Sequence, residues 1–410
     1  MDSLMKILML CVRYPLGPGD SYMTSELADA LTEAGHEVTV FVTDWEAPAG
    51  TALHVRDEAG RPKVYRTGTK AVAGLGKIME RVTKWIASPL AAARTMRKTL
   101  GDERFDLVLG FTPCVTIGPQ LAWLRRNYNP PSMLFIHDFF PYHHRSIGLV
   151  PSGPPFALAR RLEENLIRGF DVIGCNWPSN IDYLRSHYRL RPEQKTLWTP
   201  LWTDITPVPQ EDSQAIREKW NLPLDRRIVV YGGQITEGRG IPELLAVARR
   251  AERERPDLAF LFVGSGRLTD LVTKAAGEHG NVHHIGWVER DNYLRLIRAC
   301  DIGILATVEG VDSSSFPTKA IDYLRAGLPI IAAVEAESDL RSFLEEWRIG
   351  DSIAAGDTDA LYAALIRQAD AVATTTQPQD QARKCLEEVF DVGHMVRRIE
   401  SEFATSDRTA

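Results

Sequence analysis

The first part of the chain reads as a strand, a helix and a second strand, and this order constrains the fold more than any other feature. The apolar run MKILMLCV, residues 5–12, is typical of a strand that is buried on both faces. Apolar residues then recur at helical spacing from Leu27 to Ala34, Gly35 marks the end of this helix, and a second apolar run covers residues 38–42. A strand, a helix and a strand in this order form the unit from which parallel sheets are built.

The loop that joins the first strand to the first helix contains Gly17 and Gly19. A loop with glycines allows the backbone N–H groups at a helix start to approach an anion. The dinucleotide-binding pattern GxGxxG is incomplete here, so the same glycines are equally compatible with a tight turn. Contact with a ligand and a plain turn both stay open for this loop.

The alternation of apolar strands and helical segments continues along the chain, breaks once and then restarts. Before the break, strands are predicted at residues 106–112, 132–138 and 171–177. The break, at residues 196–213, is rich in proline and acidic residues, which is typical of a linker. After it, strands are predicted at residues 227–234, 258–266, 281–288, 301–308 and 329–334. We therefore predict an α/β protein with two Rossmann-like, doubly wound domains, and we expect ligands at the carboxyl ends of the strands.

The composition excludes several classes of protein. A hydrophobic fraction of 44% and a charged fraction of 25% are typical of soluble globular proteins, and a formal net charge of -6 gives no reason to expect a nucleic-acid partner. The five cysteines are far apart and form no CxxC pair, which indicates reduced cysteines in a cytosolic protein. No apolar segment reaches the ~18 residues of a membrane span, and the first residues lack a signal-peptide pattern. We expect a cytoplasmic protein, unless it attaches to a surface.

One candidate ligand segment in the second half is YGGQITEGRG, residues 231–240. Gly233 leaves a predicted strand there, and Arg239 stands just before a predicted helix. A cation beside helix N–H groups suits a diphosphate, although an arginine at a helix start is more often a solvated side chain. The later segment FVGSGR, residues 262–267, is a second glycine-rich strand end that is compatible with a ligand loop or with a plain turn.

The segment HHIGWV carries two adjacent histidines, His283 and His284, before Gly286, Trp287 and Val288. Adjacent residues on a strand point to opposite faces of the sheet, so the histidine pair is a poor metal site. The segment nevertheless follows a strand end, where a ligand of this kind of sheet would lie.

The most specific segment is VDSSSFPTKAIDYLRAGLPIIAA, residues 311–333. Ser314 and Ser315 precede Phe316 at a predicted helix start, where hydroxyl and backbone N–H groups can hold phosphate or sugar oxygens. Lys319 and Asp322 fall in the first turns of the helix. An ordinary capped helix is the plainer interpretation of the same pattern.

These segments, in this order, resemble the family-4-type retaining glycosyltransferases of the GT-B fold over nearly the whole chain. The segment LADALTEAGHEVTV matches the first helix and second strand of the family, and GGQITEGRG is the counterpart of a Gly-Arg-Leu-x3-Lys-Gly motif. The segment FPTKAIDYLRAGLPIIA is similar to Pro-Ser-Lys-x-x-Glu-Tyr-x-x-x-Gly-x-Pro-Val-Ile-Ala, and this is the specific match of the three.

The resemblance implies a GT-B fold, in which two Rossmann-like domains face each other across a cleft. It implies an acceptor-binding domain at residues 1–203, a nucleotide-sugar-binding domain at 204–385 and a C-terminal helix at 386–410 that crosses back to the first domain. It also implies transfer of a sugar from a UDP- or GDP-linked donor to a hydroxyl acceptor with retention of anomeric configuration, as in a retaining hexosyltransferase. No cofactor and no metal are expected. The expected donor-binding residues are Gly17, Gly19, Gly233, Arg239, Gly286, Trp287, Val288, Ser314, Ser315, Phe316, Lys319 and Asp322.

The segment FIHDFFPYHH, residues 135–144, follows a predicted strand of the first domain and resembles the His-Asp segment of the family. The resemblance implies that His137 faces the donor sugar and that Asp138 orients His137 or contacts the acceptor. The same segment, with His143 and His144, has a density of potential metal ligands. A metal site is therefore the alternative for this segment.

The chain departs from the family motif at three positions. The family carries two glutamates separated by seven other residues, for which this sequence has Ser314 and Asp322, and Gln234 stands where the family has an arginine. Glu309 and Asp312 lie nearby, but their spacing does not fit. Two alternatives remain beside glycosyl transfer. One is a nucleotide-sugar epimerase, because the same two-domain cleft hosts that chemistry, and the other, motivated by Ser314, is a non-catalytic protein that binds a nucleotide-sugar or acts as a scaffold.

The segment from 61 to 98 is strongly basic in a chain that is acidic overall, and Glu80 is its one acidic residue. Apolar residues at helical spacing, Trp85 among them, accompany the cations, which is typical of a helix that lies on an anionic membrane surface. Packing of the apolar stripe on the first domain is equally compatible. The first interpretation predicts a peripheral protein at the inner membrane face with a lipid-linked acceptor, and the second predicts a soluble acceptor.

Overall fold

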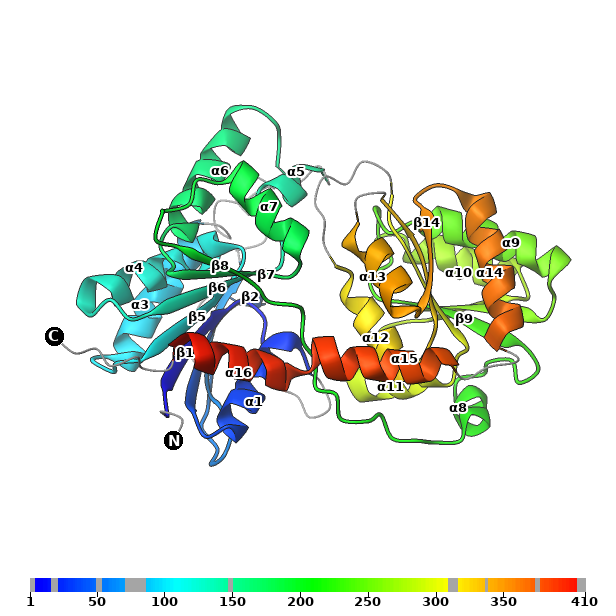
Figure 1. Cartoon of the computed structure of the whole chain (residues 1–410), viewed down its shortest axis with the longest axis horizontal. Coiled ribbons are helices and arrows are strands. Elements are labelled where there is room, and N and C mark those ends of the chain that lie inside the picture. The colour runs from blue at the N-terminus through cyan, green and yellow to red at the C-terminus, as the bar shows by residue number, and fades with distance from the viewer. Residues whose placement is uncertain are drawn as a thin grey trace. The chain divides into compact units, whose positions relative to one another are not determined.

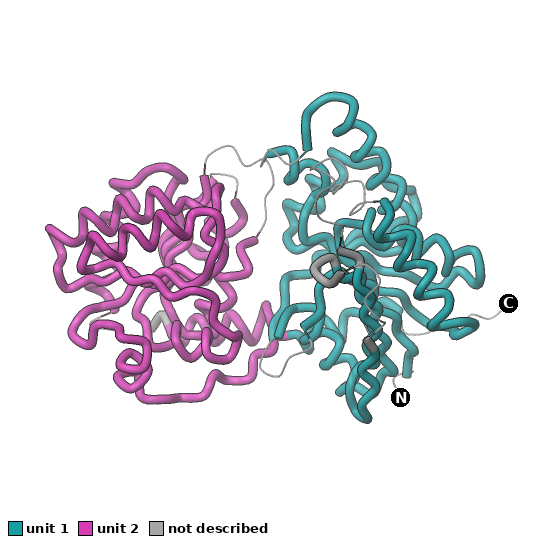
Figure 2. The backbone as a smooth tube through the Cα atoms, turned by 180° about the vertical axis from the view of Figure 1, so that it is seen from behind, with its two compact units in different colours: residues 1–16, 21–203, 392–410 teal, residues 17–20, 204–391 magenta. Residues whose placement is uncertain are grey.

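The computed structural model describes residues 4–15, 21–48, 54–70, 86–146, 150–308, 316–335, 338–372 and 377–403. Within these residues the chain divides into two compact units (Figure 2). The first unit contains the described residues up to Thr203 together with the C-terminal helix that begins at Val392. The second unit contains the described residues from Asp204 to Asp391.

The described part of the first unit forms an eight-stranded sheet with the order β3-β4-β2-β1-β5-β6-β7-β8 (Figure 1). Every neighbouring pair is parallel except β3 and β4. The strands are β1 (Lys6–Cys11), β2 (Glu37–Pro48), β3 (His54–Arg56), β4 (Lys63–Lys70), β5 (Leu107–Phe111), β6 (Ser132–Ile136), β7 (Val172–Cys175) and β8 (Lys195–Trp198). The helices are α1 (Met23–Glu33), α3 (Ser88–Leu100), η2 (Cys114–Thr116), α4 (Gly118–Asn127), α5 (Tyr142–Ser146), α6 (Pro154–Ile167), α7 (Pro178–His187) and α16 (Val392–Phe403).

The second unit has a six-stranded parallel sheet with the order β11-β10-β9-β12-β13-β14. Its strands are β9 (Arg227–Gly232), β10 (Leu258–Val263), β11 (Val282–Ile285), β12 (Ile302–Ala306), β13 (Ile330–Val334) and β14 (Gly350–Ala354). Its helices are α8 (Ser213–Lys219), α9 (Ile241–Glu254), α10 (Thr269–Glu278), α11 (Arg290–Arg298), α12 (Thr318–Ala326), α13 (Asp339–Trp347), α14 (Thr358–Val372), α15 (Gln377–Cys385) and η3 (Leu386–Phe390). The strand order reverses between β9 and β12, and in doubly wound sheets ligands bind at this point.

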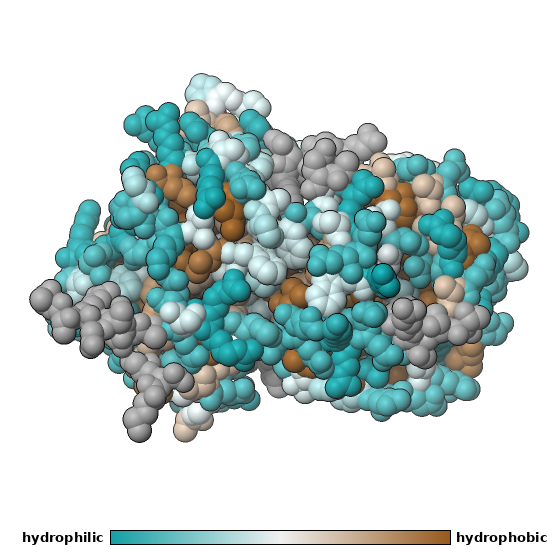
Figure 3. Space-filling model, in the orientation of Figure 1, coloured by the Kyte–Doolittle hydropathy of each residue, from teal (hydrophilic) through white to brown (hydrophobic). Residues whose placement is uncertain are grey.

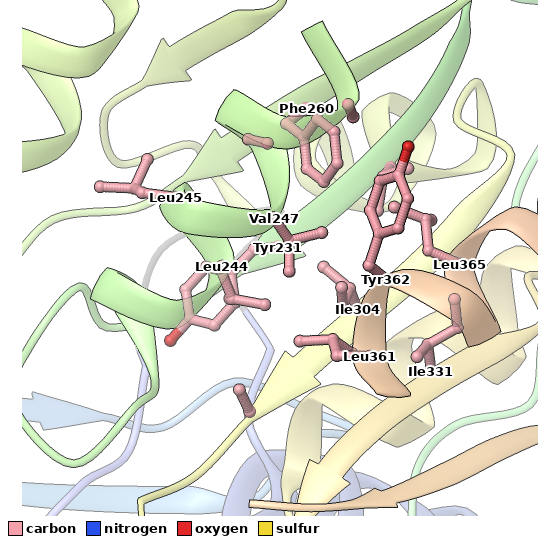
Figure 4. Packing of buried hydrophobic residues seen from close by; sticks show 14 of the residues in the cluster. Tyr231, Leu244, Leu245, Val247, Phe260, Ile304, Ile331, Leu361, Tyr362 and Leu365 are labelled. Carbon is pink, nitrogen blue, oxygen red and sulfur yellow. The ribbon is translucent and has the colours of Figure 1, made fainter. Parts of the chain in front are cut away.

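The core of the second unit explains why this alternating sequence folds as a layered α/β domain. Strands such as β10 are buried on both faces, as a parallel sheet covered by helices requires. Side chains of α9, α14 and the strands pack together on one face of the sheet, as Figure 4 shows for Leu244, Phe260, Ile304 and Leu361. The apolar stripe of α9 therefore provides much of the burial that stabilises the unit.

The predicted strands are confirmed, and the structure adds four that the sequence pattern did not predict: β3, β4, β8 and β14. β8 lies partly in the segment that was interpreted as a linker, and β14 has a polar, half-buried sequence. β4 and α3 together account for the two ends of the basic segment 61–98, so its first part is a strand and not a helix. Its centre, with Lys77, Arg81, Lys84 and Trp85, lies outside the described residues.

The C-terminal helix α16 packs against the N-terminal part of the first unit. It packs on α1 through Met395, Val396 and Ile399, which are buried. Nε2 of the buried His36 lies 3.1 Å from a carboxylate oxygen of Glu400. The chain re-enters the first unit at Val392 and not at residue 386, because η3 is held in the second unit: Leu386 and Phe390 are buried there, and the Phe390 ring lies 5.6 Å from that of Phe316.

In the part of the chain that the structure describes, we find no helix with the length and apolarity that crossing a bilayer requires. On the face shown in Figure 3, hydrophobic residues lie in separate patches among hydrophilic ones. Two exposed apolar side chains are four residues apart here: Ile86 lies just before α3, and Leu90 lies in its first turn.

Glu163 of α6 is a buried carboxylate that caps another element of the first unit. Its two oxygens accept hydrogen bonds from the N–H groups of Cys114 and Val115 at the start of η2, at 2.7 and 2.9 Å. Burial raises the pKa of Glu163 to about 7, and the two N–H groups oppose this shift. The carboxylate thereby satisfies two donors that would otherwise be buried without an acceptor.

Replacing Glu163 by alanine should lower the free energy of unfolding by about 2 kcal/mol or more, because two buried N–H groups lose their acceptor. Urea denaturation of the full chain measures this change. Asn165→Ala, which removes an exposed polar side chain of the same helix, is the matched control and should change stability little. Equal effects of the two substitutions would contradict this role for Glu163.

Candidate functional site

The glycines after β9 and β10 bring two strand ends into close contact. Gly264 has a φ of +133°, and a Cβ atom on it would lie 2.0 Å from the carbonyl oxygen of Gly233. The N–H of Gly233 donates to the carbonyl of Val263 at 2.9 Å, and the N–H of Gly264 donates to that of Ile285 at 2.9 Å. Gly264, in the segment FVGSGR, is therefore needed because it lets the backbones at the ends of β9 and β10 approach closely. The structure gives it a packing role at the edge of the predicted site.

Arg239 and Gly240 stand where α9 begins. Gly240 has a left-handed φ of +59°, and a Cβ on it would lie 2.4 Å from Cβ of Ala306, at the end of β12. The helix start is thus pressed against the strand at which the sheet order reverses. Arg239 is half-buried and forms no ion pair with any residue that the structure describes. A cation at a helix N-terminus is unfavourable unless an anion accompanies it.

Lys319 lies in the first turn of α12, and its side chain reaches the end of β9, at the point where the strand order reverses. Its ammonium group lies 3.8 Å from the ring centroid of Tyr231, and 3.6 Å from where a Cβ of Gly233 would be. Although part of the side chain is exposed, burial and the charge of Arg239 hold the pKa of Lys319 well below its usual range, and the charge of Asp322 acts in the opposite direction. Lys319, like Arg239, has no carboxylate partner among the described residues.

Tyr323 fixes α12 against the sheet. Its hydroxyl donates to the carbonyl of Ile304 at 3.0 Å and accepts from the N–H of Gly232 at 3.0 Å. A Cβ on Gly303 would lie 2.4 Å from the Tyr323 ring, so this glycine is needed for the helix to approach. The neighbouring Asp322 forms an ion pair at 2.6 Å with Arg290, the first residue of α11.

The remaining predicted donor residues have different surroundings. Phe316 is buried, and its ring lies 5.4 Å from that of Phe343, so its side chain is part of the hydrophobic core and only its backbone can serve a ligand. Trp287 is 74% exposed in the loop after β11, beside the exposed Gly286 and the partly exposed Val288. The predictions for Gly17, Gly19, Ser314 and Ser315 fall outside the described residues.

In the first unit, His137 follows β6 and is held by aromatic rings. Its imidazole stacks on Phe111 at 5.8 Å, with 8° between the ring planes, and lies 5.9 Å from Trp202. The hydroxyl oxygen of Thr112 accepts the N–H groups of His137 and Asp138, at 3.0 and 3.3 Å. The Asp138 side chain is exposed, whereas Nδ1 of His137 is buried and has no hydrogen-bond partner in the described structure.

Burial lowers the pKa of His137 from 6.5 to about 4, and the Asp138 charge and a hydrogen bond with Asn176 oppose this shift. The imidazole is therefore neutral near pH 7 and can offer a hydrogen bond but no charge. His143 and His144 lie on α5 with their ring centroids 5.9 Å apart. No group of three or more His, Cys, Asp or Glu side chains with the arrangement of a metal site occurs among the described residues.

The lowered pKa of His137 predicts how stability depends on pH. Between pH 6.5 and about 4 the unfolded chain binds a proton at His137 that the folded chain does not, so the free energy of unfolding falls as the pH falls. The full effect is about 3 kcal/mol, since each pKa unit corresponds to ~1.4 kcal/mol. His137→Phe, which keeps an aromatic ring, should lose less stability than the wild type over this range. Parallel curves from denaturation at several pH values would contradict the prediction.

The sequence patterns did not identify Thr112, Asn176, Trp202 or Arg290. Trp202 lies in the proline-rich segment that was interpreted as a linker, yet it is 1% exposed and its indole N–H donates to the carbonyl of Met23 at 2.7 Å. The apolar residues in the first part of that segment, Leu197, Trp198, Leu201 and Trp202, were the available signal. For Arg290 no local signal existed, because its partner is on another helix.

Residues 19–200 match the family model described as Glycosyltransferase Family 4, and residues 212–375 match the model described as Glycosyl transferases group 1. Between them the two models match most of the chain. The chain is a glycosyltransferase of the family-4 type. The predicted family resemblance is thereby confirmed at this level.

Proteins that are similar to most of this glycosyltransferase are themselves named as glycosyltransferases. The putative colanic acid biosynthesis glycosyl transferase WcaI of Escherichia coli (strain K12) is 23% identical over 364 residues, which cover 83% of this chain and 86% of the relative. Phosphatidyl-myo-inositol mannosyltransferase of Mycolicibacterium smegmatis is 24% identical over 375 residues, which cover 88% and 84%.

Solved structures of similar proteins show the fold of the glycosyltransferase. Sucrose-phosphate synthase from Thermosynechococcus elongatus superposes with a TM-score of 0.72 at 18% identity and covers 97% of this chain and 98% of its own. HepE of Anabaena in complex with UDP-glucose superposes with a TM-score of 0.67 at 15% identity, covering 97% and 100%. The predicted GT-B fold, with two Rossmann-like domains, is confirmed.

Proposed function

We propose that this glycosyltransferase is a retaining hexosyltransferase that moves a sugar from a UDP- or GDP-linked donor to a hydroxyl acceptor. The observation that carries the proposal is the pair of cations, Arg239 and Lys319, at the reversal point of the second sheet. Both lie beside strand ends that are joined by close backbone contacts, and neither has a carboxylate partner among the described residues. Two such cations suit a diphosphate.

In the proposed reaction the bond between the anomeric carbon and the diphosphate oxygen breaks, and the acceptor hydroxyl oxygen bonds to that carbon. The hydroxyl proton passes to the departing diphosphate. Negative charge therefore develops on the diphosphate as it leaves. Arg239, Lys319 and the N-terminus of α9 would stabilise that charge, which is where catalysis has to act.

Of the three cations that the resemblance implies for this site, Gln234 replaces one, and Arg239 and Lys319 remain. The resemblance implies an arginine at position 234, but the Gln234 side chain carries no charge, and the backbone carbonyl of Gln234 accepts a hydrogen bond from the hydroxyl of Tyr231 at 2.7 Å. The ammonium of Lys319 lies over the ring of the same tyrosine. The fold thus supplies the second positive charge from α12 and not from the strand end after β9.

In the first unit we assign the catalytic role to His137 and Asp138. The stacked, neutral imidazole of His137 can hydrogen-bond a sugar hydroxyl with little loss of entropy, because Phe111 and Trp202 already hold the ring. The exposed carboxylate of Asp138 would orient His137 or contact the acceptor.

The donor classes are supported by the names of similar proteins. A similar structure described as trehalose-6-phosphate from E. coli is bound with UDP-2-fluoro glucose, and HepE was solved with UDP-glucose. A relative from Corynebacterium glutamicum is named a GDP-mannose-dependent mannosyltransferase.

For the acceptor we propose a lipid-linked sugar at an anionic membrane surface. The name of the phosphatidyl-myo-inositol mannosyltransferase supports this acceptor, and so do the exposed Ile86 and Leu90 within the basic segment.

Thermal unfolding of the full chain with UDP or GDP tests the donor site. A ligand that binds only the native protein raises the melting temperature, so one of the two nucleoside diphosphates should raise it more than its monophosphate does. The monophosphate is the control because it lacks the second phosphate that Arg239 and Lys319 would share. No shift with either diphosphate at millimolar concentration would contradict the proposed donor site.

A further inference from the structure

We propose that Arg290 is a positioning residue that holds Asp322 away from Lys319 and so keeps the Lys319 ammonium available for the donor diphosphate. This inference rests on the proposed function, because it concerns the same diphosphate site. It assigns Arg290 a role through another residue, without contact to the donor.

The geometry of α12 sets up a competition for the Asp322 carboxylate. Lys319 and Asp322 are three residues apart on this helix, and side chains at that spacing are neighbours that commonly pair when their charges are opposite. The two are close enough for the Asp322 charge to raise the pKa of Lys319. They nevertheless form no ion pair, and the ammonium lies over the ring of Tyr231.

Arg290 pairs with the Asp322 carboxylate and holds it away from Lys319. One of its guanidinium nitrogens lies 2.6 Å from Oδ1 of Asp322, and both side chains are mostly buried, at 19% and 15% exposure. Arg290 is the first residue of α11, where the helix dipole disfavours a cation. The position is therefore favourable only through a partner outside α11, and Asp322 on α12 is such a partner.

The surroundings of the pair are rigid, which limits other ways for Asp322 to move. Tyr323, next along α12, is fixed by hydrogen bonds to Gly232 and Ile304. Tyr293, one turn after Arg290 on α11, places its hydroxyl against Gly232, where a Cβ would lie 2.0 Å from it. Both helices are thus anchored on the same strand end. If the Arg290 side chain is removed, a change of the Asp322 side-chain rotamer would bring its carboxylate toward Lys319.

Inorganic pyrophosphate is the probe for this inference, because it has no ribose or base that Asp322 could contact. Arg290→Met should weaken pyrophosphate binding by about threefold or more, since Asp322 then pairs with Lys319 and neutralises it. Arg290→Met combined with Asp322→Asn should restore binding to the wild-type level, and Arg290→Lys should retain it. Calorimetry on the full chain measures each affinity.

Two controls separate positioning from the mere loss of a positive charge. Arg295→Met removes an arginine of the same helix that pairs with Glu211 at 2.5 Å, and it should leave binding unchanged. In a Lys319→Met background, Arg290→Met should have no further effect, because the cation it protects is already absent. A further loss in that background, or no effect of Arg290→Met in the wild type, would overturn the inference. If wild-type protein binds neither pyrophosphate nor a nucleoside diphosphate, the proposed donor site itself is wrong.

Discussion

Turnover should fall by about 100-fold or more when His137 is replaced by alanine, while the affinity for the nucleotide-sugar changes little. The residue belongs to the first unit, whereas the cations that we assign to the diphosphate, Arg239 and Lys319, belong to the second. Loss of His137 would therefore remove an interaction with the reacting sugar and leave the diphosphate contacts in place. Steady-state kinetics combined with calorimetry of the donor separates the two quantities.

His137→Phe distinguishes chemistry from packing. Phenylalanine retains a ring that can stack on Phe111 and Trp202, but it cannot donate or accept the hydrogen bond. We expect the phenylalanine variant to be nearly as slow as the alanine variant. His279→Ala is a matched control, because this histidine pairs with Glu252 and belongs neither to the surroundings of His137 nor to the pair of cations. Near-normal turnover of His137→Phe would assign His137 to structure alone.

Arg239→Ala should weaken the binding of a nucleoside diphosphate by about 1.5–3 kcal/mol, the range for hydrogen bonds that involve a charged group. The full effect is expected because Arg239 is half-buried and has no carboxylate partner in the described structure, so its charge is not already neutralised. Calorimetric titration with UDP and with GDP measures the change directly.

The matched control for Arg239 is Arg267→Ala. Arg267 lies in the neighbouring loop after β10, but its side chain is 75% exposed and its guanidinium pairs with Glu237 at 2.9 Å. Its removal should change the affinity by much less, since an exposed ion pair contributes at most about 1 kcal/mol. If Arg239→Ala binds nucleoside diphosphates as tightly as Arg267→Ala does, Arg239 is not part of the donor site.

Much of the fold could be predicted from the sequence, because local signals and tertiary burial agree. The helix that was predicted just after Arg239 is α9, which begins at Ile241, and its apolar residues recur on one buried face. Gly327 ends α12 with a φ of +73°, a left-handed conformation that favours glycine at the end of a helix. β14 was missed because its sequence GDSIA is short, polar and only partly buried, so it lacks the apolar run of the central strands.

The candidate site was predictable only where its residues belong to a motif. Arg239, Lys319 and Asp322 were found through segments that follow strand ends, and the structure brings Arg239 and Lys319 to the strand end of the same sheet. The pair of Arg290 with Asp322 could not be predicted, because it joins residues of different helices without any local pattern. The sequence also could not show that the Phe316 ring packs in the core, which leaves only the backbone of Phe316 for the predicted ligand contact.

Incubation of the full chain with radiolabelled UDP- and GDP-linked hexoses, together with a panel of lipid-linked and soluble hydroxyl acceptors, tests the central claim most directly. We predict that label appears in an acceptor in equal amount to the released nucleoside diphosphate, and that NMR of the product shows the anomeric configuration of the donor. An inverted anomeric configuration would contradict retention. Isomerised donor with unlabelled acceptors would show an epimerase, and tight donor binding without any turnover would show a binding protein; either result would contradict glycosyl transfer.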